Sequence, residues 1–188
     1  MLFRSWTVVP AAEATPLPWV LPLHIVDPAG RVAALLLAVW TVQVRGNGTY
    51  AQQVGRAIDV WAEEIRRGPT LLAGDLNCTA QGSPPRHQLD VDRLERLGAV
   101  SAYHAHHGLG HGREDAMTLR WIGPGGEPKA YHCDFVFASA DLLPAITSVE
   151  VGTFGDWIET GMSDHCPVIV DFDRPSPVGG GRGGRRLR

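Results

Sequence analysis

The 188-residue sequence contains only three cysteines, Cys78, Cys133 and Cys166, which are odd in number and far apart. No two of them have the CxxC spacing of a zinc ribbon, and an odd number argues against a disulfide framework. We therefore expect reduced cysteines and a cytoplasmic protein.

Long apolar runs are also missing. The N-terminal segment MLFRSWTVVPAAEATPLP has no apolar core of the length found in secretory signal peptides. No other stretch approaches the roughly 18 consecutive apolar residues that a membrane-spanning helix needs. The sequence therefore predicts no membrane span, and it leaves the oligomeric state open.

Positive charge is scarce outside the C-terminus. Residues 174–188, RPSPVGGGRGGRRLR, hold five of the 17 basic residues and no acid, so the remaining chain carries twelve basic and twenty acidic residues. This excess argues against tight general binding to duplex DNA, although carboxylates gathered around a divalent cation would contribute to it. With 44% hydrophobic residues, we expect residues 1–173 to form a single domain and residues 174–188 to be a disordered Gly/Arg tail.

Short β-rich apolar runs recur along the chain. They predict strands over residues 3–9, 19–26, 32–44, 70–75, 131–139 and 166–172. The polar region 80–116, rich in Gly, Pro and His, is predicted to be largely loop, with one short helix around residues 91–97.

One amphipathic helix is predicted over residues 49–67. It follows a Thr49-x-x-Gln52 capping box and precedes a Gly68-Pro69 stop. Together with the strands before and after it, this helix forms a strand–helix–strand unit. The sequence therefore predicts an α/β layered sandwich.

The stretch LLAGDLNC places Asp75 and Asn77 two positions apart at the end of a predicted strand. In α/β folds, side chains beyond the carboxyl end of a strand face the ligand cleft, and Gly74 permits close approach of a backbone or a ligand. Asp75 can bind a metal or orient a nucleophile, and Asn77 can donate an amide N–H to a developing oxyanion. An Asx turn explains the same pair at least as well.

The stretch HCDFVF embeds an acid, Asp134, in an apolar strand. Strand alternation puts Asp134 and Val136 on one face and Cys133, Phe135 and Phe137 on the other, so Cys133 is predicted to be a core residue. A carboxylate in this setting is either held for function or is an edge-strand acid that faces water.

The stretch MSDHCPV places Asp164 and His165 directly before a strand. A carboxylate and a titratable imidazole at this position can reach a shared cleft, although such pairs also occur at ordinary turns.

In their order and spacing, the three motifs resemble the endonuclease/exonuclease/phosphatase family of metal-dependent phosphoesterases, over roughly residues 17–173. The resemblance implies a four-layer sandwich of two face-to-face β-sheets flanked by helices, with the active site at one end. It also implies Mg²⁺ or Mn²⁺ as cofactor and a phosphoester substrate. Nucleic acid, a phospholipid head group and a small phosphoester all remain open as that substrate.

The resemblance also implies a role for each motif residue. Asp75 and Asn77 hold the nucleophilic water and the scissile phosphate. Asp134 orients and polarises a histidine, which is His165, and Asp164 is a metal-site carboxylate. These roles suit phosphodiester hydrolysis, which needs an activated water and neutralised charge on the phosphate oxygens.

The sequence departs from the family pattern at its start. The early strand with an Asn and the strand whose Glu is the principal metal ligand are missing, and Trp40 stands where relatives often carry a histidine. We therefore expect an N-terminally incomplete fold, through a wrong start site or real loss, and a chain that is weakly active or inactive. The rival hypothesis is a non-catalytic scaffold whose polar motifs only stabilise the fold.

A histidine cluster lies outside these motifs. His104, His106, His107 and His111 form an HxHHxxxH pattern that can bind zinc or nickel. Because no Cys or Glu shares a fixed ligand spacing with them, a solvated loop is the favoured interpretation.

Overall fold

The computed structural model describes residues 6–12, 14–81 and 84–173, so the predicted tail at 174–188 lies outside the described residues. The strands are β1 (Thr7–Pro10), β2 (Val20–Val26), β3 (Val32–Trp40), β4 (Thr70–Asp75), β5 (Ala99–Ser101), β6 (Leu119–Ile122), β7 (Pro128–Tyr131), β8 (Asp134–Ser139), β9 (Ile146–Val151) and β10 (Val168–Phe172). The helices are α1 (Tyr50–Val60), α2 (Ala62–Arg67), α3 (Pro84–Arg96), α4 (Ala102–His107), α5 (Phe154–Trp157) and the 3₁₀ helix η1 (Leu143–Ala145).

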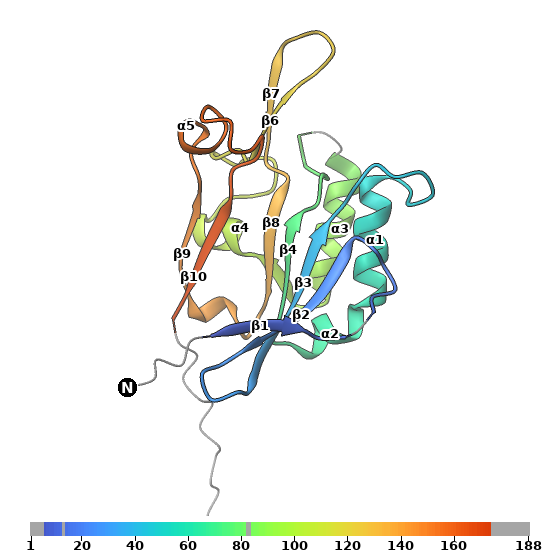
Figure 1. The fold of residues 1–188 in the computed structure, drawn as a ribbon, viewed down its shortest axis with the longest axis vertical. Coiled ribbons are helices and arrows are strands. Elements are labelled where there is room, and N and C mark those ends of the chain that lie inside the picture. The colour runs from blue at the N-terminus through green and yellow to red at the C-terminus, as the bar shows by residue number, and fades with distance from the viewer. Residues whose placement is uncertain (1–5, 13, 82–83, 174–188) are drawn as a thin grey trace, which may run out of the picture.

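The main sheet has six strands in the order β1-β2-β3-β4-β8-β5, as Figure 1 shows for its central strands. Strands β3 and β4 are parallel and are joined by α1 and α2, which confirms the predicted strand–helix–strand unit. The neighbours β4 and β8 are antiparallel. Two smaller sheets are formed by β9 with β10 and by the hairpin β6–β7.

The start of α1 has the predicted capping box. The Thr49 hydroxyl accepts a hydrogen bond from the Gln52 amide at 3.3 Å, and the Gln52 side chain accepts one from the Thr49 amide at 2.8 Å. The single helix predicted over 49–67 is two helices, because Trp61 has non-helical dihedral angles between α1 and α2. Gly68 caps the end of α2, at the predicted stop.

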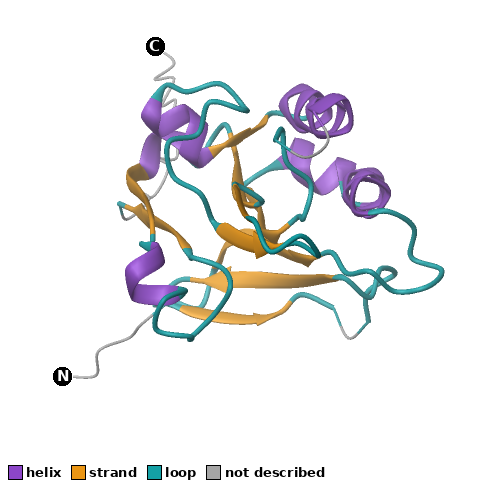
Figure 2. Cartoon of the chain, turned by 90° about the horizontal axis from the view of Figure 1, so that it is seen from above, coloured by secondary structure: helices purple, strands orange, loops and turns teal. Residues whose placement is uncertain are grey.

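The two faces of the main sheet are covered differently. Helices α1 and α3 lie together on one face (Figures 1 and 2), where apolar side chains from both helices share a core with β3, β4 and β8. On the other face, Val136 of β8 packs in a second cluster with Val149 of β9 and Val168 and Val170 of β10. The predicted α/β sandwich of two packed sheets with flanking helices is thereby confirmed.

The prediction that residues 80–116 are mainly loop is wrong. This region contains α3, β5 and α4. Helix α3 buries the polar residues His87 and Asp90 beside Val91 and Leu94, so its inner face lacks a continuous apolar pattern. Helix α4 has only six residues, which is too short for helical periodicity to emerge.

All three cysteines are buried and free, and the predicted core position of Cys133 is confirmed. In the part of the chain that the structure describes, no helix has the length and apolar character to cross a bilayer. The cytoplasmic location stays a prediction.

Candidate active site

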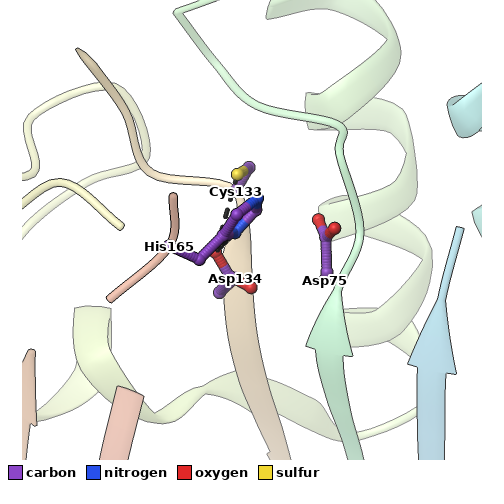
Figure 3. Close-up of side chains that lie close together, drawn as sticks. All are labelled: Asp75, Cys133, Asp134 and His165. Carbon is purple, nitrogen blue, oxygen red and sulfur yellow. Dashed lines mark hydrogen bonds and ion pairs between the residues drawn. The ribbon is translucent and has the colours of Figure 1, made fainter. Parts of the chain in front are cut away.

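Strand pairing brings together two of the acidic residues that were predicted to belong to the active site. In the antiparallel register of β4 and β8, Asp75 at the end of β4 is the direct partner of Asp134 at the start of β8. Figure 3 shows Asp75 beside Asp134 and His165 at this end of the sheet. Asp134 is not a water-facing edge-strand acid, because its side chain is largely buried and pairs with His165.

Gly74 sets the path of the chain into this site. Its φ is +135°, and a Cβ atom built on it would lie 2.0 Å from the backbone oxygen of Val39 in β3. Only glycine tolerates this approach. Of the two possibilities that the sequence left open for Gly74, close approach of a backbone or of a ligand, the structure shows the first: Gly74 makes room for the backbone of β3.

Asp75 and Asn77 form an Asx turn at the end of β4. The Asn77 backbone amide donates to Asp75 Oδ1 at 2.9 Å, and its side-chain Nδ2 donates to Asp75 Oδ2 at 2.7 Å and to the Thr41 carbonyl at 3.2 Å. Asn77 itself has a positive φ of 47°. Its amide group thus positions Asp75 here, and its role as an oxyanion donor stays a prediction.

Asp134 and His165 form a dyad. His165 Nδ1 lies 2.8 Å from Asp134 Oδ2, and the backbone amide of His165 donates to Ser163 Oγ at 3.0 Å. With Nδ1 turned to the carboxylate, Nε2 is the ring atom left for a substrate or a water molecule. This is the arrangement that the family resemblance implied for the two residues.

Thr118 positions Asp134 from the side. Its hydroxyl, on a fully buried residue, accepts hydrogen bonds from the backbone amides of Cys133 at 3.0 Å and Asp134 at 3.1 Å. The family resemblance places the segment Thr118–Trp121 near the substrate, but no local pattern in the sequence indicates that the Thr118 hydroxyl bonds the backbone at Asp134.

The electrostatics of the site indicate excess negative charge. Burial and the charge of Asp134 raise the pKa of Asp75 to about 6, against the opposing effects of His165 and Asn77. The hydrogen bond to Asp134 raises the pKa of His165 despite burial. A bound cation would relieve the repulsion between the carboxylates.

The donor atoms suit a divalent cation. Ligand atoms of Asp75, Cys133, Asp134 and His165 all lie within 4.8 Å of one another. Hard cations such as Mg²⁺ prefer carboxylate oxygens, and burial raises the pKa of the Cys133 thiol, which keeps it protonated. Asp75 and Asp134 are therefore the residues that fit a metal.

Asp164 lies apart from this group. It is exposed, and among the described residues it is not one of the four whose ligand atoms converge. Its backbone carbonyl accepts a hydrogen bond from the Arg120 amide at 3.3 Å. A metal on Asp164 stays a prediction.

An open cleft adjoins the site. It has a volume of about 360 Å³. Its lining residues are Tyr50, Asn77, Thr79, Leu119, Trp121, Tyr131 and Cys133. Tryptophan side chains are usually buried in the core, but Trp121 is 44% exposed. The cleft thus presents aromatic side chains beside the polar groups.

Asp75→Asn should stabilise the metal-free protein at neutral pH. The folded-state pKa of about 6 exceeds the ordinary value of 3.8, so the wild type loses stability as the pH rises from about 4 to 6. We expect a gain of about 2 kcal/mol at pH 7.5, which disappears at pH 4, because each pKa unit corresponds to about 1.4 kcal/mol. Urea unfolding in EDTA at both pH values measures this. An equal gain at the two pH values would contradict the electrostatic cause.

Comparisons with known proteins support the fold. No protein-family model and no curated protein matches the chain. Among solved structures, an AP endonuclease from Archaeoglobus fulgidus matches with a TM-score of 0.62 and 16% identity, over 91% of this chain and 71% of that one.

Two further solved structures match over the same share of this chain. The 3′ phosphatase NExo from Neisseria, bound to a product DNA hairpin, has a TM-score of 0.60 and 17% identity, over 91% of this chain and 72% of that one. The endonuclease domain of TRAS1, a telomere-specific non-LTR retrotransposon, has a TM-score of 0.58 and 17% identity, over 91% and 70%. The chain therefore has the DNase I-like fold of endonuclease/exonuclease/phosphatase proteins.

Proposed function

We propose that this chain hydrolyses phosphoester bonds in nucleic acid with the help of Mg²⁺ or Mn²⁺. The observation that carries the proposal is the Asp134–His165 pair, joined at 2.8 Å. Asp75 lies beside this pair in one group of converging side chains (Figure 3). Such a pair can activate a water molecule, and a second carboxylate beside it can help to hold the cation that neutralises the phosphate.

His165 acts as the general base. Asp134 accepts the Nδ1 hydrogen of His165 and holds the ring, so that Nε2 takes a proton from the attacking water. Thr118 holds the backbone at Asp134, and Asn77 holds the Asp75 carboxylate. Asp75 and Asp134 would hold the divalent cation, which when bound neutralises charge on the phosphate oxygens.

The cleft and the matching solved structures support nucleic acid as the substrate class. The relatives are nucleases and a 3′ phosphatase bound to a DNA hairpin. Tyr50, Trp121 and Tyr131 line the cleft beside Asn77, and aromatic faces stack on unpaired bases. Because the body of the chain is acidic, we infer recognition of one or a few nucleotides at an end, gap or lesion.

Hydrolysis assays with defined substrates test this proposal. The chain is incubated with Mg²⁺ or Mn²⁺ and with a 3′-phosphorylated DNA hairpin, an abasic duplex, a phospholipid or bis(p-nitrophenyl) phosphate, against EDTA. We expect metal-dependent turnover of the DNA substrates. Trp121→Ala should lower kcat/KM on DNA roughly tenfold and leave bis(p-nitrophenyl) phosphate unaffected, since stacking contributes about 1–3 kcal/mol per base.

Two outcomes would contradict the proposal. A folded chain without turnover on any substrate would favour the non-catalytic scaffold. Turnover of phospholipid or of the small ester alone, with no effect of Trp121→Ala, would place the activity outside nucleic-acid chemistry.

A further inference from the structure

A second group of titratable side chains lies apart from the Asp134–His165 dyad. His104 in α4 and Glu114, in the segment after α4, are 5% and 7% exposed, and His111 is half-buried. The solvated-loop interpretation of the histidine motif is therefore wrong for these residues. His106 and His107 are exposed, as that interpretation expected, but they lie in helix α4 and not in a loop.

The three side chains converge. His104 Nε2 lies 3.0 Å from Glu114 Oε1, and the rings of His104 and His111 stack with centroids 3.6 Å apart. One ligand atom from each residue lies within 4.8 Å of the others. Donors on one tetrahedral zinc ion are roughly 3.3 Å apart, because each lies about 2.0–2.1 Å from the metal. Because the two rings are stacked with an interplanar angle of 18°, they would rotate out of the stack to direct one nitrogen each at a shared ion.

Each of the two histidines is oriented by a hydrogen bond to its other ring nitrogen. Ser101 Oγ lies 2.8 Å from His104 Nδ1, which directs Nε2 of His104 toward Glu114. His87 Nε2 lies 3.0 Å from His111 Nδ1. When His111 donates its Nδ1 hydrogen to His87, Nε2 of His111 keeps its lone pair.

The carboxylate of Glu114 is also fixed. Its Oε1 accepts from the Gly112 amide at 2.9 Å, and its Oε2 accepts from Gln81 Nε2 at 2.5 Å. Metal-binding residues are typically oriented by hydrogen bonds of this kind to groups outside the ligand set.

The cluster is withdrawn from solvent, because the side chains of His104 and Glu114 are 5% and 0% exposed. A carboxylate held away from water needs a positive partner, and a bound cation would supply that charge.

We propose that His104, His111 and Glu114 bind one zinc ion, with His87 and Ser101 orienting the histidines. Two imidazoles and a carboxylate are a donor set that suits zinc-class transition metals better than Mg²⁺. The ion would tie α4 to the following segment. Through Gln81, which bonds Glu114, it would also brace the loop that leaves the active-site strand after Asn77.

Zinc titration of the untagged full chain tests the site. Zinc is removed with a chelator, excess Mg²⁺ is added, and bound zinc and the Tm are measured. We expect stoichiometric zinc and a rise in Tm of several degrees. His111→Gln and Glu114→Gln should weaken zinc binding roughly 10- to 100-fold or more and abolish the Tm rise.

Two controls locate the ion. His106→Gln changes an exposed histidine on the same helix, and Asp75→Asn changes the active site, so both should bind zinc as the wild type does. Because His111 is half-buried, His111→Gln is expected to stay folded, which circular dichroism verifies. The proposal is overturned when the wild type binds no zinc, when both ligand variants still bind it, or when Asp75→Asn alone loses it.

Discussion

His165→Ala is expected to lower metal-dependent hydrolysis by about three orders of magnitude and to leave the protein folded. General-base catalysis contributes roughly 10²- to 10⁴-fold, and His165 is the base of the proposed mechanism. Its side chain is only partly buried, so its removal should cost little stability. Initial rates on the 3′-phosphorylated hairpin, with circular dichroism of both proteins, measure the effect.

The pH profile separates catalysis from structure. Asp134 raises the pKa of His165, and a base must be unprotonated, so activity should rise with pH through that raised pKa. Asp134→Asn should move this acidic limb to lower pH and also reduce kcat, because the ring loses its orienting carboxylate. His106→Ala, which changes an exposed histidine, should alter neither. Full activity of His165→Ala would exclude this residue as the base.

Gly74→Ala is expected to destabilise the fold by about 3–5 kcal/mol. The substitution combines a positive φ, which disfavours a side chain, with overpacking against the β3 backbone. A Cβ atom would lie 2.0 Å from Val39 O and 3.0 Å from Val39 C, and neither atom belongs to a flexible side chain. Urea unfolding of the two proteins gives the difference.

Gly30→Ala is the matched control. Gly30 also has a positive φ, of +85°, but nothing lies within 4 Å of its added Cβ. The Gly30→Ala protein should therefore lose only the stability that the unfavourable positive φ costs, about 1 kcal/mol in the free energy of unfolding. Equal losses at the two positions would show that the contact with Val39 is unimportant. Any folded Gly74→Ala protein should also have reduced activity, because Asp75 follows directly.

Local patterns in the sequence were enough to locate the motifs and several elements. The Thr49 capping box and the helical spacing after it predicted α1, and alternation placed Phe135 and Val136 on opposite faces of β8, as the two core clusters confirm. These features depend on neighbouring residues, whose geometry is determined by strand and helix periodicity.

For one motif the sequence allowed two interpretations, and the structure shows that both can hold at once. Asp75 and Asn77 were expected to be either site residues or an Asx turn. The structure shows the turn, with the Asp75 carboxylate still directly opposite Asp134. A two-residue motif cannot separate these outcomes, because the same hydrogen bonds that close the turn also orient the acid.

Only the tertiary structure determined which residues from distant segments of the chain contact one another. The antiparallel register of β4 and β8 pairs Asp75 with Asp134, and α3 brings His87 to His111 across a region expected to be loop. The same packing left Asp164 exposed although it adjoins His165. Sequence periodicity reports which face a residue occupies, whereas contacts between elements depend on strand register and helix packing, which local patterns do not encode.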